Sequence, residues 1–306
     1  IKYSRLIHAL LKLRGGLHFS KNSKNLYTSR FARTDELRNL FSKASAPDGL
    51  HLGTHSFLNY FVGVHAQPRR RELGNLLIVA PTRGGKGLLA VTQLLTWNHS
   101  VIVNDIKGEL FTHTAGYRST LGEVFVLDPT GTGHRYDPLS GKETEDELFS
   151  AATQLLFTAD DGDGIIFTQR AAVMLTQILT AARTEGIAPL PYVRHAIRSG
   201  PKETAARLHS ISAHLATQFL DTRFEDANFT DRFFLSCWGT LATRLRPMLT
   251  ETVIRSFTTS DFAPGSLLKK TTTVYLRWKE RDLRALSPLV RLLWETFIDE
   301  LTSTYD

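Results

Sequence analysis

The sequence is poor in sulfur: it has one cysteine and two methionines among 306 residues. A single cysteine, Cys237, cannot form a disulfide within the chain, which excludes a disulfide-stapled secreted scaffold, and a lone cysteine is usually a packing residue. No apolar run reaches the roughly 20 residues that cross a bilayer, and the first residues lack the apolar stretch of a signal peptide. With 42% hydrophobic residues, the composition is that of an ordinary globular chain.

Positive charge is concentrated at the start of the chain. The net charge is +7 overall, but residues 1 to 74 carry 13 Lys and Arg against 4 Asp and Glu, while the rest is slightly acidic. Such an arm suits contact with nucleic acid phosphates or an anionic membrane surface, and a solvated flank fits the same charge equally well. Local patterns in this region predict a short helix at 35 to 41 and a loop at 44 to 53. Because the chain does not begin with methionine, we expect the natural N-terminus to lie upstream.

A glycine-rich loop follows an apolar run at 75 to 80 that fits a buried strand, and a helix is expected from 88 to 97. Small residues let backbone N–H groups converge on phosphate oxygens, a lysine reaches the outer phosphates, and the positive helix N-terminus faces the anion. Two positions depart from the general pattern: Ala80 replaces the first glycine, and Gly87 replaces the hydroxyl that usually meets Mg²⁺. The predicted nucleotide-binding residues are Pro81, Thr82, Arg83, Gly84, Gly85, Lys86 and Gly87.

Strands and helices alternate after this loop. Strands are expected at 100 to 105 and 123 to 128, with a helix at 109 to 120 between them, and this order predicts a parallel sheet with right-handed crossovers. Asp105 ends its strand at the carboxyl edge of that sheet, where open α/β folds bind ligands. The alternative is an ordinary glycine turn with a solvated Lys86, and the strand, loop, helix and strand context makes it the weaker interpretation.

Helical patterns replace the strands after Asp137. They include 202 to 219 and 230 to 246, before a strand returns at 272 to 277. Ser287 and the proline after it then predict the start of a final helix. The sequence therefore predicts an α/β fold, a parallel sheet with an inserted all-α domain. The expected domains are a basic flank at 1–74, a nucleotide-binding domain at 75–142 and 257–306, and the helical insertion at 143–256.

No metal-ligand cluster is predicted. The acidic stretch at 160 to 164 lacks the spacing of a Ca²⁺ loop, because Ile165 occupies a ligand position, so it is expected to be a turn between helices. His113 and His134 stand alone without ligand spacing.

Several separate stretches resemble one family, the conjugative coupling ATPases of type IV secretion systems, which are TraG-like members of the FtsK/HerA superfamily. The loop at 80 to 87 is similar to that family's A-P-T-R-S-G-K-G, so both departures from the general pattern match the family's own form. Ile106 replaces the proline of the family's D-P-K-G-E segment. The other similar stretches are Ser29-Arg30-Phe31-Ala32, Leu94-Leu95-Thr96-Trp97, Tyr136-Asp137-Pro138-Leu139, Ser260-Asp261-Phe262 and Thr273-Val274-Tyr275-Leu276.

The resemblance implies a P-loop NTPase domain of RecA-like type that takes ATP and Mg²⁺. Lys86, Asp105 and Glu109 are then the candidate catalytic residues, with Asp105 and Glu109 assisting water or metal positioning. A stabilising pair between Glu109 and a lysine is the alternative. The family's Walker B strand, ending in Asp-Glu, would follow a helix at 288 to 301, and no such strand occurs in this sequence. We therefore expect a truncated core that binds nucleotide with little turnover; whether this chain is itself an enzyme stays open.

The family also implies partners and a location. The complete protein would be a hexameric motor on the cytoplasmic side of the bacterial inner membrane, held by an N-terminal anchor, passing DNA or a relaxase–DNA complex to a secretion channel. The helical insertion is the candidate substrate receptor. Four basic residues in it would contact phosphates only if they share one face, and a solvated surface is the preferred interpretation: Arg194, Arg198, Lys202 and Arg207. Two alternatives are a chromosomal or viral DNA translocase and a non-enzymatic adaptor with a degenerate nucleotide pocket.

Overall fold

The computed structural model describes residues 41–42, 49–55, 60–65, 76–129, 132–157 and 162–305. The contacts divide the chain into two units, residues 1–41 and 42–306, and the second unit is described below. Strand β1 (Phe41–Ser42) lies at their boundary. Most of the basic arm lies outside the described residues, as do the segment at 29 to 32 and nearly all of the helix predicted at 35 to 41.

Three parallel strands form the centre of the second unit. They are β4 (Val101–Asn104), β5 (Glu123–Leu127) and β6 (Thr272–Leu276), in the order β4-β6-β5. All three strands were predicted, and the structure confirms them. The strand that returns last in the sequence is the central one, and every residue of β6 is buried. The helical insertion therefore leaves the sheet after β5 and comes back into its middle.

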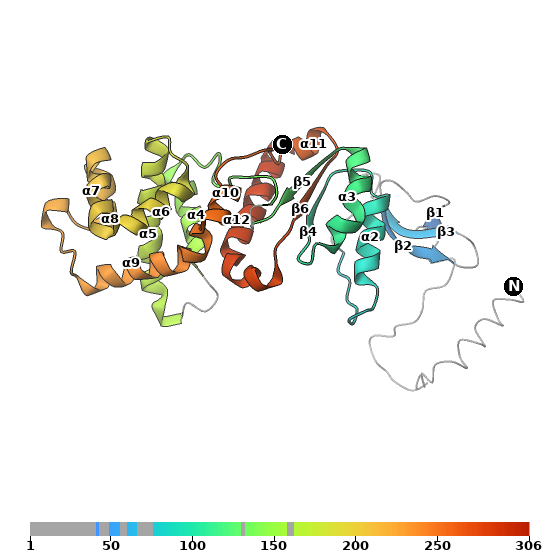
Figure 1. Ribbon diagram of the computed structural model, residues 1–306, viewed down its shortest axis with the longest axis horizontal. Coiled ribbons are helices and arrows are strands. Elements are labelled where there is room, and N and C mark those ends of the chain that lie inside the picture. The colour runs from blue at the N-terminus through green and yellow to red at the C-terminus, as the bar shows by residue number, and fades with distance from the viewer. Residues whose placement is uncertain are drawn as a thin grey trace, which may run out of the picture. The chain divides into compact units, whose positions relative to one another are not determined.

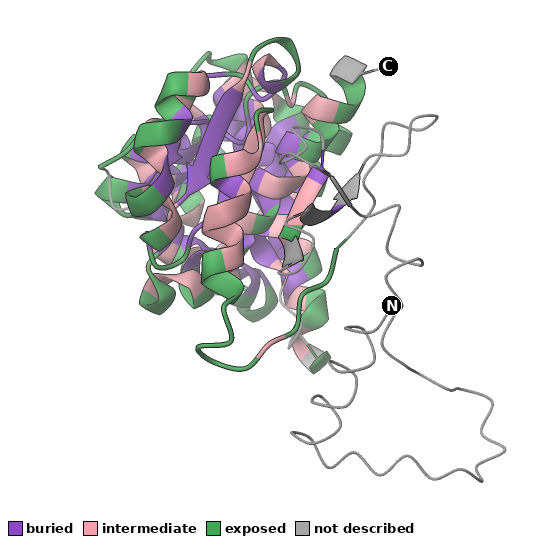
Figure 2. Ribbon diagram, turned by 90° about the vertical axis from the view of Figure 1, so that its right-hand side faces the viewer, coloured by how far each residue is buried: buried purple, intermediate pink, exposed green. Residues whose placement is uncertain are grey.

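Helices cover both faces of this sheet (Figure 1). On one face, α2 (Lys86–Thr96) and α3 (Glu109–Leu121) pack over Leu94, Val103 and Tyr275. On the other face, α12 (Glu280–Tyr305) packs its apolar side against the core that continues into the helical block. Figure 2 shows the buried strands between helices whose outer faces are exposed. The result is a layered α/β core, as parallel strands require.

The final helix begins earlier than predicted. The prediction placed its start at Ser287, but α12 begins at Glu280 and contains Pro288. The proline removes one backbone donor, which normally ends or kinks a helix. Here Leu286, Leu289 and their neighbours on the same face are buried in the core, so apolar packing carries the helix through the proline.

A block of helices fills the insertion (Figure 1). Its longest helix, α5, is almost entirely surrounded by the others. In the described part of the chain, α5 is the one helix long and apolar enough to span a membrane, and 61% of that window is buried, as for the core helix of a folded domain. Ser212 divides the helix predicted at 202 to 219 into two. The block comprises α4 (Glu145–Leu156), α5 (Ile165–Thr184), α6 (Pro189–Ser199), α7 (Pro201–Ile211), α8 (Ala213–Leu220), α9 (Arg232–Leu245) and α10 (Glu251–Ser256), and α11 (Ser266–Lys269) precedes β6. Short 3₁₀ turns lie at Gly162–Gly164, Phe224–Asp226 and Arg246–Leu249.

The strand predicted at 75 to 80 is wrong for this structure. Residues 76 to 80 have no regular secondary structure, and Leu77 and Val79 are 87% and 85% exposed. A strand needs a neighbour to pair its backbone N–H and C=O groups. No described strand runs beside this segment, since the parallel sheet comprises only β4, β6 and β5. The segment is apolar, as a buried strand would be, but an apolar sequence does not by itself provide a neighbouring strand to pair with.

An antiparallel hairpin was missed. Strands β2 (Gly49–His55) and β3 (Tyr60–His65) pair from Gly49 opposite His65 to His55 opposite Tyr60, so the loop predicted at 44 to 53 is partly wrong. Gln93 of α2 holds this hairpin: its Oε1 accepts from the backbone N–H of His51 at 2.8 Å. Its Nε2 donates to the carbonyl of Gly49 at 3.3 Å. The hairpin is thereby attached to the helix that follows the glycine-rich loop.

Candidate functional site

The glycine-rich loop makes a tight turn directly before α2. The N–H of Gly84 donates to the carbonyl of Pro81 at 2.9 Å, and Gly85, with φ of 85°, is the N-cap of the helix. A Cβ at Gly84 would lie 2.9 Å from the Pro81 carbonyl oxygen, so the turn needs glycine there. No side chain caps the first turn of α2. Its leading N–H groups therefore have no side-chain partner, which is the arrangement found at helix N-termini that bind anions.

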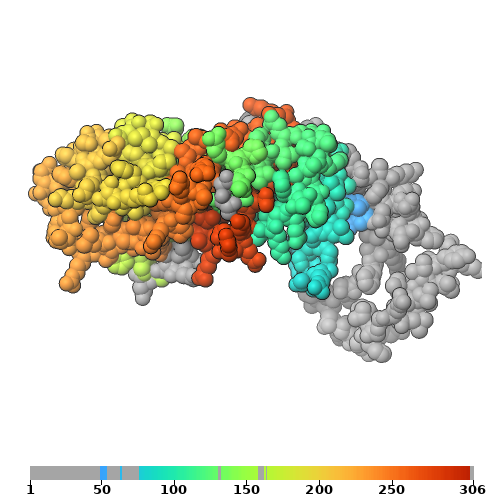
Figure 3. Space-filling view, viewed as in Figure 1, coloured from blue at the N-terminus to red at the C-terminus, as the bar shows by residue number. Residues whose placement is uncertain are grey.

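Lys86 folds back across this turn. Its Nζ donates to the carbonyl oxygens of Ala80 and, at 3.1 Å, of Pro81. The side chain is exposed, and it is the first residue of α2. In the space-filling view, the segment from 76 to 96 lies at the surface (Figure 3). The ammonium group thus bonds the carbonyls of the glycine-rich loop, and the contact of Lys86 with phosphates stays a prediction.

Asp105 is buried and has a structural task. Its N–H donates to the carbonyl of Leu276 at 2.8 Å, which continues the β4–β6 ladder by one residue. Its Oδ2 accepts from the N–H of Phe111 at 2.8 Å and so caps the first turn of α3. The carboxylate lies at the carboxyl edge of the sheet, where the sequence analysis placed it. A role of Asp105 in catalysis stays a prediction.

Glu109 lies in a different environment. It is the first residue of α3 and is exposed, whereas Asp105 is buried. Among the described residues, no ion pair joins Glu109 to a lysine, so the structural pair considered above does not form there. An acidic residue in the first turn of a helix is favourable in itself because of the helix dipole. The two acidic residues therefore share one edge of the sheet but differ in burial.

Sequence reasoning missed Arg277, which follows the last residue of the central strand. Its guanidinium carbon lies 5.1 Å from the centre of the Phe111 ring. Its Nη2 lies 3.2 Å from the position that a Cβ on Gly108 would take, and Gly108 has φ of 74°. A basic residue directly after a buried strand, at the level of Asp105 on the neighbouring strand, is the signal that identifies it.

Arg118 was missed as well. It is fully buried in α3, and its Nη groups donate to the carbonyl oxygens of Trp97 and, at 2.6 Å, of His99, which follow the end of α2. Its Nε donates to Thr273 Oγ1 of β6 at 2.8 Å. Burial lowers the pKa of this guanidinium. A cation at the C-terminus of α2 is favourable, so Arg118 braces the far end of the helix that begins at Lys86.

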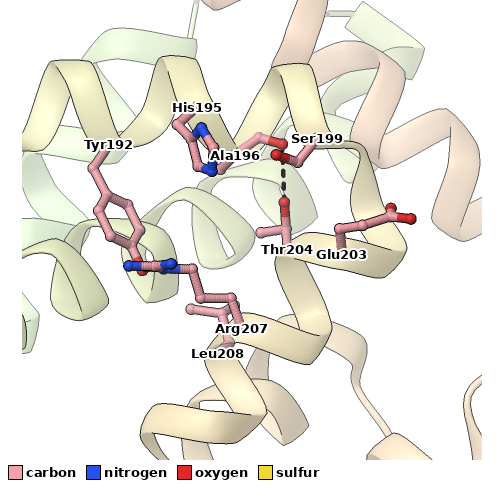
Figure 4. Close-up of a pocket in the computed structure, with 8 residues that line it drawn as sticks. All are labelled: Tyr192, His195, Ala196, Ser199, Glu203, Thr204, Arg207 and Leu208. Atoms are coloured by element: carbon pink, nitrogen blue, oxygen red, sulfur yellow. Dashed lines mark hydrogen bonds between the residues drawn. The ribbon is translucent and has the colours of Figure 1, made fainter.

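A pocket of about 180 Å³ lies between α6 and α7 in the helical block (Figure 4). Tyr192 and His195 approach it from α6, and Arg207 approaches it from α7. Arg207 is already engaged: it donates twice to Glu185 at 2.9 and 3.0 Å through Nη2, and its Nε donates to the Tyr192 hydroxyl at 3.1 Å. The basic residue of this pocket is therefore neutralised by a neighbour, which does not suit a phosphate contact.

Comparison with known proteins assigns the family. The family model described as "Type IV secretory system Conjugative DNA transfer" matches residues 43–305. The chain belongs to this conjugative DNA transfer family. Among curated members, it is 27% identical over 308 residues to Protein VirD4 of Rhizobium rhizogenes, covering 92% of this chain and 43% of that protein. It is 28% identical over 281 residues to the conjugal transfer protein TraG of Escherichia coli, covering 81% and 42%. The chain thus spans about two fifths of the length of these relatives.

Structural comparison supports the same fold. The bacterial conjugative coupling protein TrwBdeltaN70, in its trigonal form with sulphate, superimposes with a TM-score of 0.55 at 13% identity, covering 72% of this chain and 50% of that one. Its unbound monoclinic form gives a TM-score of 0.52. The predicted fold class, an α/β parallel sheet with a helical insertion, is confirmed, and so is the predicted membership of the coupling-protein family.

Proposed function

We propose that this chain is the ATP-binding core of a coupling protein that delivers DNA, or a relaxase–DNA complex, to a type IV secretion channel. The observation that carries the proposal is the start of α2, where Gly85 is the N-cap, no side chain caps the first turn, and Lys86 folds back over the glycine-rich loop. Membership of the conjugative DNA transfer family supports the same conclusion.

The residues of the loop would divide the work of holding a triphosphate. Backbone N–H groups of residues 85 to 88 would take phosphate oxygens, and Lys86 would move from the Ala80 and Pro81 carbonyls to the outer phosphates. Asp105 could accept a hydrogen bond from a metal-bound water. Its Oδ2 accepts from the Phe111 N–H, but its Oδ1 has no hydrogen-bonding partner among the described residues. Mg²⁺ would supply neutralisation of phosphate charge. Proline and threonine at 81 and 82 shape the turn.

Turnover is expected to be slow. Positioning and charge neutralisation do not suffice unless a group orients the attacking water. Glu109, exposed at the start of α3, is the candidate for that task in this chain. Because Glu109 is exposed and no ion pair among the described residues fixes its carboxylate, we infer that the chain alone binds nucleotide and hydrolyses it slowly. By the family resemblance, the complete protein would be a hexamer at the cytoplasmic side of the inner membrane, working with relaxosome and channel proteins.

The first test is nucleotide binding by the chain. Removal of a charge-assisted hydrogen bond costs about 1.5 to 3 kcal/mol, so Lys86→Ala is expected to raise the Kd for Mg-ATP by roughly 10- to 150-fold. Lys202→Ala removes an exposed lysine from α7 and is the matched control. Titration calorimetry on both variants measures the effect, with circular dichroism to check folding. Equal affinity of Lys86→Ala and the parent chain would contradict the proposed site.

A second test separates a motor from an adaptor. The full gene product carrying Lys86→Ala is expected to lose conjugative DNA transfer in a mating assay while remaining folded, because phosphate binding drives the motor. Normal transfer by a folded variant would instead favour the adaptor. A chromosomal or viral translocase of the same superfamily would bind nucleotide in the same way but would not bind relaxase or channel proteins.

A further inference from the structure

A charged residue directly follows each of the three parallel strands, and the three lie at the same level of the sheet. Asn104 and Leu127 are both in register with Leu276 of the central strand. The next residues in register are Asp105, Arg277 and Asp128. Backbone hydrogen bonds continue to this level, from Asp105 N to Leu276 O at 2.8 Å and from Arg277 N to Leu127 O at 2.9 Å. Because registered residues of parallel strands face the same side, all three side chains start from the face covered by α2 and α3.

Of these three residues, Arg277 is the one whose side chain has no hydrogen-bonding partner in the described part of the chain. The carboxylate of Asp105 accepts from Phe111, and that of Asp128 accepts from Thr132 at 3.2 Å. In the described ranges, the Arg277 side chain has neither a hydrogen bond nor an ion pair, and its contacts are the Phe111 face and Gly108. The side chain is half-buried. A half-buried guanidinium stacked on an aromatic ring keeps its fork of donors oriented for a planar or tetrahedral oxyanion.

Two helix N-termini converge on the same edge. The chain enters both α2 and α3 at the carboxyl edge of the sheet and leaves them at the opposite edge, and the helices pack side by side (Figure 1). Packed helices have axes about 8 to 10 Å apart. Lys86 begins one of these helices, and Arg277 stacks on the first turn of the other, at Phe111. A chain of phosphates that starts at Lys86 would therefore have to span about the 8 to 10 Å between neighbouring helix axes to meet the guanidinium.

We propose that Arg277 binds the terminal phosphate of the nucleotide whose inner phosphates lie on the loop before Lys86. This inference rests on the proposed nucleotide site and adds to it a residue that distinguishes a triphosphate from a diphosphate. Lys86 and the loop hold any nucleotide with at least two phosphates. Arg277, one helix away, contacts only the phosphate that ATP has and ADP lacks. Gly108 is part of the same arrangement, because a side chain there would crowd the guanidinium.

The test compares ATP with ADP in calorimetric titrations of the whole chain with Mg²⁺. Arg277→Gln is expected to weaken ATP binding roughly tenfold or more and ADP binding less than twofold. Arg277→Lys keeps the charge but not the fork, so it is expected to fall between the parent and Arg277→Gln. Lys86→Ala serves as the reference variant, which is expected to weaken the binding of both ATP and ADP. Arg255→Gln removes an exposed arginine from α10, 64% exposed, and is the matched control. Thermal unfolding establishes that each variant is folded.

The outcomes separate this inference from the proposed function. If the parent chain binds neither nucleotide, both are wrong. If the parent binds ATP and Lys86→Ala does not, while Arg277→Gln keeps the parent's preference between ATP and ADP, only the role of Arg277 is wrong. A loss of DNA affinity in Arg277→Gln with unchanged ATP and ADP affinities would likewise overturn it, because the guanidinium would then serve DNA phosphates. Should Arg277→Gln unfold, Arg277→Lys decides by the same ratio.

Discussion

Arg118→Met is expected to lower the free energy of unfolding by about 3 to 5 kcal/mol, since it leaves one buried and two partly buried acceptors without their donor, at about 1 to 3 kcal/mol each. Methionine keeps an unbranched apolar stem, but it is shorter than arginine and donates no hydrogen bond. The carbonyl oxygens of Trp97 and His99 and the hydroxyl of Thr273 would each lose the bond that Arg118 provides. The substitution therefore removes the side-chain hydrogen bonds by which Arg118 links α3 to the end of α2 and to the central strand.

Urea unfolding followed by circular dichroism measures this effect. Arg281→Met, at a 76% exposed side chain on α12, is the control and is expected to change stability by less than about 0.5 kcal/mol. A loss below about 1 kcal/mol in Arg118→Met would show that water satisfies the carbonyls and that the guanidinium is dispensable. The same variant is expected to weaken Mg-ATP binding only through its lower folded fraction, since Arg118 lies at the end of α2 remote from Lys86.

Asp137→Asn is expected to stabilise the protein near neutral pH and leave it unchanged in acid. Burial raises the pKa of Asp137 to about 6 from 3.8, against the hydrogen bond from Leu139 N and the attraction of Arg183. The native state therefore favours the protonated acid, and this contribution is complete below pH 3.8 and is lost as the pH rises through about 6. The shift corresponds to about 3 kcal/mol at pH 7 to 8. Asparagine keeps an acceptor for Leu139 without the buried charge.

The measurement is the difference in unfolding free energy between variant and parent at pH 4, 5, 6, 7 and 8. It is expected to rise from near zero to about 3 kcal/mol across this range. Asp299→Asn, an exposed carboxylate on α12, controls for the loss of one negative charge. A variant that is less stable than the parent at pH 8 would contradict the prediction and show that attraction to Arg183 outweighs the cost of burial.

The strands of the parallel sheet were predictable because local patterns specify them. Runs such as Val101 to Val103 and Thr273 to Leu276 are short, β-branched and bounded by polar residues, which is typical of buried strands. Their order was not predictable, since the pairing of β6 between β4 and β5 depends on contacts across the helical insertion. Local pattern also failed at Pro288, where packing of the α12 apolar face outweighs a residue that normally ends a helix.

In the candidate site too, some residues were predictable from the sequence and others were not. The loop at 81 to 87 is a continuous stretch whose glycines and lysine carry a known chemistry, so the sequence alone is enough to predict it as a site. Arg277 and Arg118 act through residues far away in the sequence: 155 positions separate Arg118 from Thr273. Neither residue belongs to a local motif. Asp105 was placed correctly at the sheet edge, but its hydrogen bond to Phe111 shows a capping task that the sequence pattern did not reveal.

The position of β6 in the sheet has a consequence for synthesis on the ribosome. β4 and β5 do not pair with each other. Both pair with β6, which begins 145 residues after Leu127. At about 5 to 20 residues per second, β6 emerges roughly 7 to 30 s after β5. The helical insertion emerges first, although its core is continuous with the core on the α12 side of the sheet. The three described strands of the parallel sheet thus come together only after the helical insertion has been made, and during that interval the edges of β4 and β5 are open to pairing with other nascent chains.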